Sequence, residues 1–93
     1  MLELKTYHDT DPQGEDFVSF VLEGDTYKIK DQIKELGFHW GFPLYVRLEL
    51  GEAADDPMFK KNKRWNRTFK AANEGTPRCQ EWLEEVRTKL NIQ

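Results

Sequence analysis

One apolar run, Phe17-Val18-Ser19-Phe20-Val21-Leu22, places the strongest constraint on how this chain folds. It is followed by Glu23-Gly24-Asp25 and by a second β-rich run, residues 26–29. Two such runs around a Gly-Asp pair predict a tight hairpin, because glycine accepts the positive φ that the turn requires. A chain of 93 residues without internal repeats has room for one domain, which we expect to span residues 1–93.

Two helices are predicted from apolar spacing. Residues 30–36 place Ile33 and Leu36 on one face, and Gly37 follows where a left-handed residue would end the helix. The longer helix starts at Thr76-Pro77, with threonine as the cap and proline in the first turn. Its apolar stripe consists of Cys79, Trp82, Leu83, Val86 and Leu90.

Strict alternation predicts further strands. Residues 44–50 alternate leucine or valine with polar or aromatic residues, and residues 64–71 place Trp65, Arg67 and Phe69 on one face. Residues 2–7 also alternate and predict an edge strand, whereas residues 51–63 lack periodicity and predict a loop. The predicted fold is α+β: a mostly antiparallel sheet of four or five strands, with the short helix and the longer C-terminal helix on one face.

Composition excludes several classes of protein. The 12 aromatic residues argue against a disordered chain, and no apolar stretch approaches the ~20 residues that span a bilayer. The single cysteine allows neither an internal disulfide nor a cysteine-based zinc cluster, and the first residues lack the pattern of a signal peptide. We therefore expect a cytoplasmic protein with no membrane partner.

The net charge of -3 is the remainder of strongly unequal segments. Residues 1–27 hold seven acidic side chains and one basic one, whereas residues 57–71 hold six basic side chains and no acid. Phe59, Trp65 and Phe69 lie among these cations. Cations neutralise phosphates and flat rings stack on exposed bases, so this composition suits a nucleic-acid backbone. A solvated charged face and a core role for the aromatic residues are the alternatives.

The sequence names no reaction. Asp9-x-Asp11-x-Gln13-Gly14 resembles the start of a calcium loop, but Phe20 stands where the bidentate glutamate is needed. Cys79 is in the first turn of a helix, where a thiol pKa can fall, yet it also belongs to the apolar stripe and is expected to be a small buried hydrophobe. No catalytic set, metal site or cofactor-binding loop is recognised, so we expect a protein that is not an enzyme.

Residues 26–40, Thr-Tyr-Lys-Ile-Lys-Asp-Gln-Ile-Lys-Glu-Leu-Gly-Phe-His-Trp, carry a resemblance. They resemble a small domain of unknown function found in bacterial and phage proteins of DNA metabolism, and more loosely the HARP domain of annealing helicases. In that module a strand leads to a small helix, Leu-Gly and Trp, and the next strand carries Lys-x-Trp, here matched by Lys63-Arg64-Trp65. This chain departs from the pattern by inserting residues 44–50 and a long loop. The resemblance implies a non-catalytic, strand-rich module that contacts single-stranded nucleic acid.

The leading hypothesis is thus a non-catalytic module that binds nucleic acid, with single-stranded DNA or RNA as the expected form. The candidate binding residues are Lys30, Lys34, Trp40, Lys60, Lys61, Lys63, Arg64, Trp65, Arg67 and Lys70. Trp40 is expected in a loop, where it either covers the core or offers a stacking face, and the same two roles are open for Trp65. The alternative function is a protein-interaction or regulatory module with segregated acidic and basic faces, as a monomer or weak dimer.

Overall fold

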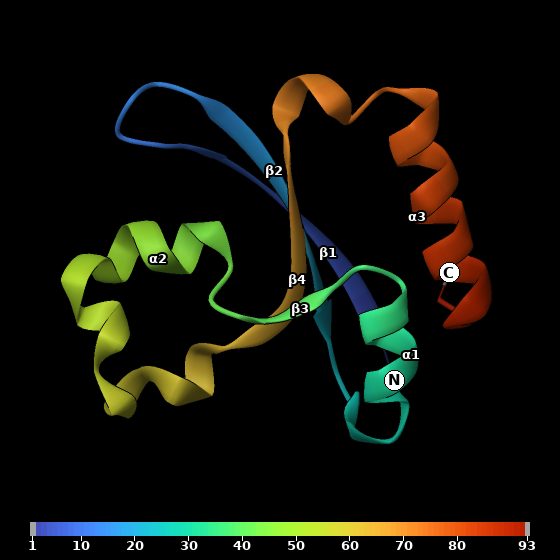
Figure 1. The fold of residues 1–93 in the computed structure, drawn as a ribbon, viewed down its shortest axis with the longest axis horizontal. Coiled ribbons are helices and arrows are strands. Elements are labelled where there is room, and N and C mark those ends of the chain that lie inside the picture. The colour runs from blue at the N-terminus through green and yellow to red at the C-terminus, as the bar shows by residue number, and fades with distance from the viewer. Residues whose placement is uncertain (1, 93) are drawn as a thin grey trace.

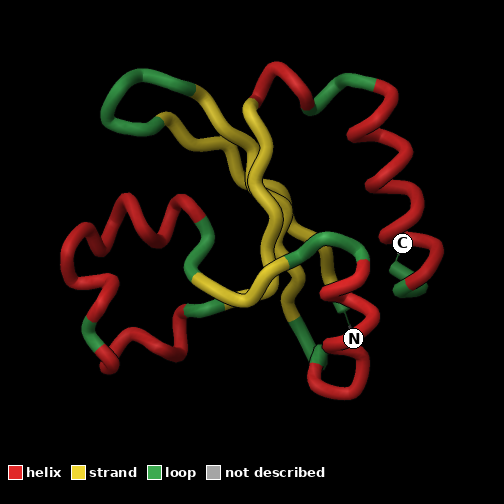
Figure 2. The backbone as a smooth tube through the Cα atoms, in the orientation of Figure 1, coloured by secondary structure: helices red, strands yellow, loops and turns green. Residues whose placement is uncertain are grey.

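The computed structural model describes residues 2–92, which form an α+β fold around a four-stranded antiparallel sheet (Figure 1). Figure 2 marks the helices, strands and loops along the backbone. The strands are β1 (Glu3–Thr10), β2 (Asp16–Glu23), β3 (His39–Gly41) and β4 (Arg64–Lys70), and the α-helices are α1 (Lys30–Glu35), α2 (Leu44–Leu50) and α3 (Pro77–Lys89). Short 3-10 helices fill the connections: η1 (Tyr27–Ile29), η2 (Gly51–Asp55), η3 (Pro57–Asn62) and η4 (Ala71–Asn73).

The apolar run of residues 17–22 lies in β2, inside the sheet. The strand order is β1-β2-β4-β3, so β2 hydrogen-bonds to β1 on one side and to β4 on the other. The predicted hairpin is wrong: with both edges of β2 occupied, residues 27–29 have no edge to pair with and form η1 instead. Gly24 does take a positive φ, 119°, but it directs the chain out of the strand toward α1.

The main core lies between the sheet and the two predicted helices, which pack on the same face (Figure 1). From β2 it takes Val18, Phe20 and Leu22, and from α1 it takes the fully buried Ile33. The stripe of α3 completes it with Cys79, Leu83, Val86 and Leu90, while Trp82 is half-buried beside it. The sequence prediction for this helix-covered face is confirmed.

Both helix ends follow the predicted chemistry. The Thr76 hydroxyl accepts a hydrogen bond from the Cys79 amide at 3.4 Å, with Pro77 as the first residue of α3. Gly37 follows α1 with φ +97°, the left-handed conformation that favours glycine. Cys79 is 2% exposed, and burial raises its pKa, with Glu74 adding to the effect. It is therefore a buried hydrophobe and not an activated thiol.

Residues 44–50 form helix α2, so the strand predicted from their alternation is wrong. Leucine, arginine and glutamate favour helices, and a helix satisfies its backbone hydrogen bonds without a neighbouring strand. Pro43 occupies the N-cap position of α2, and only Val46 is buried. The predicted loop 51–63 is likewise shorter than expected, since most of it forms η2 and η3.

Helix α2 lies across the sheet from α1 and α3, as Figure 1 shows. The Tyr45 ring of α2 stacks on Tyr7 of β1, with centroids 4.2 Å apart. This second face buries polar groups: Asn66 is 1% exposed and donates to the carbonyls of Gly41 and Arg64, and the hydroxyls of Ser19 and Thr68 are 2.9 Å apart. Within residues 2–92, no helix is both long and apolar enough to cross a membrane.

Candidate nucleic-acid interface

Trp40 and Trp65 lie opposite each other on neighbouring strands. The register of β3 and β4 pairs them directly, and their ring centroids are 5.6 Å apart with an interplanar angle of 58°. Trp65 is half-buried and packs against the core, whereas the Trp40 side chain is 53% exposed at the edge of the sheet. Trp40 therefore lies in a strand and not in the predicted loop, and its ring packs on Trp65 outside the buried cluster. Its exposed ring is supported from below by Trp65.

A solvent-open pocket of about 400 Å³ adjoins Trp40. Thr26, Lys63 and Arg64 line it together with the tryptophan. Glu23 also lines the pocket, but its carboxylate is 2.8 Å from Lys5 and 3.9 Å from Arg64. The charged residues of the lining are two cations, Lys63 and Arg64, and one carboxylate, Glu23, so the pocket wall carries an excess of positive charge.

Arg64 fixes the chain that carries the neighbouring lysines. Its Nη1 donates to the carbonyls of Lys61 at 2.7 Å and Lys63 at 2.8 Å. These bonds hold the junction between η3 and β4, where Lys60 and Lys61 are exposed. Lys63 lies over the Phe42 ring, with Nζ 5.8 Å from its centroid. The structure thus places Lys63 and Arg64 beside Trp40 at the start of β4, with Lys60 and Lys61 in the preceding η3.

Sequence reasoning missed Tyr27, the most exposed large aromatic residue that the structure shows. Its side chain is 77% exposed, and Lys30 Nζ lies 5.1 Å from its ring centroid. Its neighbour in the chain, Thr26, lines the Trp40 pocket. The sequence does place this aromatic residue three positions before Lys30, but the alternative expectation, a strand over residues 26–29, does not bring the two side chains together. We refer to Tyr27, Lys30, Trp40, Lys63 and Arg64 as the Trp40 surface.

Two predicted site residues lie away from this surface. Lys70 ends β4, about 20 Å along the strand from Arg64, and pairs with Glu15 at 3.2 Å. Arg67 faces the helices: its guanidinium carbon is 4.7 Å from the Phe69 ring centroid and 4.8 Å from that of Trp82. Lys34 is exposed one turn beyond Lys30 on α1. The cations of residues 60–70 therefore do not all converge on one surface.

Known proteins add nothing to this geometry, because no protein-family model, curated protein or solved structure matches the chain.

Proposed function

We propose that this protein is a non-catalytic cytoplasmic module that binds single-stranded nucleic acid through the Trp40 surface. The observation that carries the proposal is the exposed Trp40 ring, backed by Trp65 and bordered by Lys63 and Arg64. An indole held in this way offers a stacking face at little entropic cost, because its position is fixed before a base arrives.

Electrostatics support the same ligand. Lys60, Lys61 and Lys63 form no ion pair with any residue of the described chain, so their charges are available to phosphates. Lys30 provides a further cation beside the exposed Tyr27 ring. Two exposed aromatic rings, each with a lysine nearby, suit a strand whose bases stack while its backbone follows the cations.

The resemblance noted in the sequence agrees with the pairing of the two strands. In the module it resembles, the Lys-x-Trp lies on the next strand after the first Trp, and here residues 42–63 leave the sheet and return so that Trp65 pairs with Trp40. The intervening α2, η2 and η3 are thus an insertion between adjacent antiparallel strands. This geometry supports treating Lys63-Arg64-Trp65 as the Lys-x-Trp of that pattern.

The alternative function, a protein-interaction module with segregated charge, has less support. Its basis is the separation of acidic and basic residues along the chain. In the fold, however, β4 lies beside β2, and Lys70–Glu15 and Arg64–Glu23 pair the basic segment with the acidic one. Charges that are separated in sequence therefore partly neutralise each other in space.

The test is fluorescence anisotropy of a labelled single-stranded oligonucleotide, either DNA or RNA, titrated with the protein at several salt concentrations. We expect Trp40→Ala to weaken binding by about 5- to 100-fold, the range for loss of one stacked base. Lys63→Gln should lower the slope of log K against log salt by about 0.7.

Lys70→Gln is the matched control, because it removes the same charge at the far end of β4, away from the Trp40 surface. It should leave the salt slope unchanged. Absence of binding to any single strand at low salt would refute the proposal, and so would equal effects of Lys63→Gln and Lys70→Gln. A salt-sensitive dimer without oligonucleotide affinity, detected by size-exclusion chromatography, would instead support the protein-interaction alternative.

A further inference from the structure

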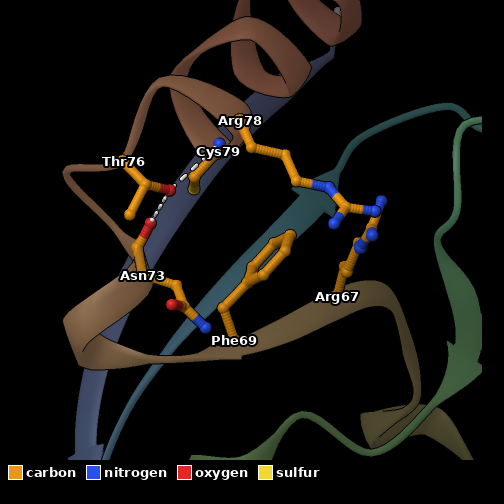
Figure 3. Close-up of a pocket in the computed structure, with 6 residues that line it drawn as sticks. All are labelled: Arg67, Phe69, Asn73, Thr76, Arg78 and Cys79. Atoms are coloured by element: carbon orange, nitrogen blue, oxygen red, sulfur yellow. Dashed lines mark hydrogen bonds between the residues drawn. The ribbon is translucent and has the colours of Figure 1, made fainter.

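A second pocket, separate from the Trp40 surface, lies between β4 and the beginning of α3 (Figure 3). Its volume is about 330 Å³, at the small end of the range for small-molecule sites. The residues around it are Arg67, Phe69, Asn73, Thr76, Arg78 and Cys79. We call it the arginine pocket, because two guanidinium groups reach it from different elements.

The two arginines point toward one another in Figure 3, Arg67 from β4 and Arg78 from the first turn of α3. Within residues 2–92, no carboxylate lies within ion-pair distance of either group. The nearby Glu74 is instead bonded to His8, with Oε1 2.8 Å from Nε2. Two like charges beside one cavity repel each other, and a bound anion would relieve that repulsion.

The position of Arg78 adds to this imbalance. A cation in the first turn of a helix lies at the positive end of the helix dipole, where it is unfavourable. The helix terminus itself is already capped, because Thr76 accepts from the Cys79 amide and Pro77 has no N–H to offer. The feature that points to an anion is therefore the arginine pair and not the helix end.

Arg67 is held with its donors available. The aromatic rings of Phe69 and Trp82 lie within 5 Å of its guanidinium carbon, and Nη1 also donates to the Leu36 carbonyl at 3.5 Å. Gly37 leaves the space for this arrangement, since a Cβ there would lie 2.5 Å from Arg67 Nη1. A guanidinium has five N–H donors in one plane, so ring contacts and a single long hydrogen bond leave several of them unused.

We propose that the arginine pocket binds a phosphomonoester. A phosphate dianion matches the charge of two guanidiniums and accepts their paired N–H groups, with the Asn73 amide as a further donor. The pocket is larger than a phosphate alone, and the Phe69 ring gives its organic substituent an apolar wall. The substituent is either a small molecule or the terminal nucleotide of a strand, and both sources offer the same phosphomonoester.

The test uses the whole protein and inorganic phosphate as the first probe, followed by NMR of backbone amides and arginine Nε–H groups at constant ionic strength. Saturable shifts are expected at Arg67 and at the start of α3. Arg78→Gln should weaken phosphate binding about tenfold or more, because it removes a charged donor from an exposed side chain without disturbing the core. Arg87→Gln, the same change near the other end of α3, should have no effect.

The proposal is overturned if phosphate produces no saturable shift at the pocket, or if Arg87→Gln weakens binding as much as Arg78→Gln. The source of the phosphomonoester is identified by comparing the binding of ribose 5-phosphate with that of a 5′-phosphorylated oligonucleotide and of the same oligonucleotide without the phosphate. If the 5′-phosphate increases the affinity for the oligonucleotide and Arg78→Gln abolishes that increase, the ligand is a strand end. If the 5′-phosphate gives no increase in affinity, the ligand is a small phosphomonoester. Because inorganic phosphate contains no base, the phosphate titration gives a result that is independent of whether the Trp40 surface binds a strand.

Discussion

The two faces of the sheet differ in how they are covered. On the face of α1 and α3, fully buried apolar side chains such as Phe20 and Ile33 pack in one continuous cluster. On the face of α2, the covering is thinner: besides the buried Val21 and Val46 it consists of a stacked tyrosine pair and the buried polar groups of Asn66 and Ser19. Apolar burial is the dominant favourable term in folding, so the first face supplies most of the stability.

Because of this difference, the residues that stabilise the fold are not the residues proposed to bind nucleic acid. Trp40 lies on the edge strand β3 and Lys63 directly before β4, both outside the main cluster, so changing them is expected to alter binding with little effect on folding. Arg67 belongs to the helix-covered face and is fixed by its contacts with Phe69 and Trp82.

The largest effect is expected from Phe20→Ala. Phe20 is 2% exposed and its ring centroid lies 5.6 Å from Trp82 and 5.9 Å from Phe69, so truncation leaves a cavity under both rings. We expect a loss of about 3–5 kcal/mol in the free energy of unfolding, measured by urea denaturation. The matched change on the other face, Tyr45→Ala, should cost clearly less, and equal losses would contradict the comparison.

Gly37→Ala should have the next largest effect. The substitution forces alanine to φ +97° and brings its Cβ against Arg67 Nη1, so both the backbone and the arginine packing are strained. A loss of about 2–3 kcal/mol is expected in the same assay. Gly14→Ala is the control, because Gly14 also has positive φ, 85°, but its Cβ would meet nothing within 4 Å. If the two variants lose the same stability, Arg67 packing contributes nothing measurable.

The pH dependence of the free energy of unfolding should report on the packing of the α2 face. Burial, followed by the adjacent Tyr7 side chain, raises the pKa of Tyr45 from 10.0 to about 12. Below pH 10 the tyrosine is neutral in both states, but between pH 10 and 12 it ionises first in the unfolded chain, which lowers the stability of the fold. After solvent screening we expect about 1–2 kcal/mol to be lost across that window.

Tyr45→Phe should remove this part of the alkaline loss, as measured by urea denaturation at about pH 9 and about pH 11. Tyr27→Phe serves as the control, because Tyr27 is 77% exposed and stacks on no other aromatic ring in the described chain. An unchanged alkaline loss in Tyr45→Phe would show that the tyrosine pair does not couple the α2 face to folding.

The smallest expected effect is a gain in the stability of the protein. Arg78→Gln removes a cation from the first turn of α3 and from beside Arg67, so the protein without phosphate should become more stable by about 0.3–1 kcal/mol. Arg87→Gln removes a cation from the favourable end of the same helix and should cost a similar amount. Thermal unfolding in phosphate-free buffer measures both, and destabilisation by Arg78→Gln would show that the two arginines do not repel.

Local signals predicted those elements whose ends and faces are specified by their own residues. Thr76-Pro77 and the apolar stripe define α3, and Gly37 ends α1. The alternation of residues 64–71 also predicted β4 correctly, because its alternate residues face a real core on one side. Residues 44–50 alternate equally well, yet they have no neighbouring strand and form α2.

The candidate site was predicted in composition but not in arrangement. The lysines of residues 60–63 and the two tryptophans were identified from sequence, and the register of β3 and β4 brings Trp40 and Trp65 together. Arg67 and Lys70 belong to the same basic segment, but strand alternation and strand length carry them to the helix-covered face and to the far end of β4. Tyr27 was missed because its exposure depends on the turn into α1.

The α+β class, the two helices of the main core and the concentration of positive charge in residues 57–71 all follow from local sequence patterns. These properties depend on nearest neighbours, caps and periodicity, which act over one or two turns of chain. Long-range packing, in contrast, sets which strands flank β2, on which face each cation lies, and which aromatic rings stay exposed. Those outcomes depend on hydrogen-bonding edges and packing partners that lie tens of residues apart, and no local pattern in the sequence specifies them.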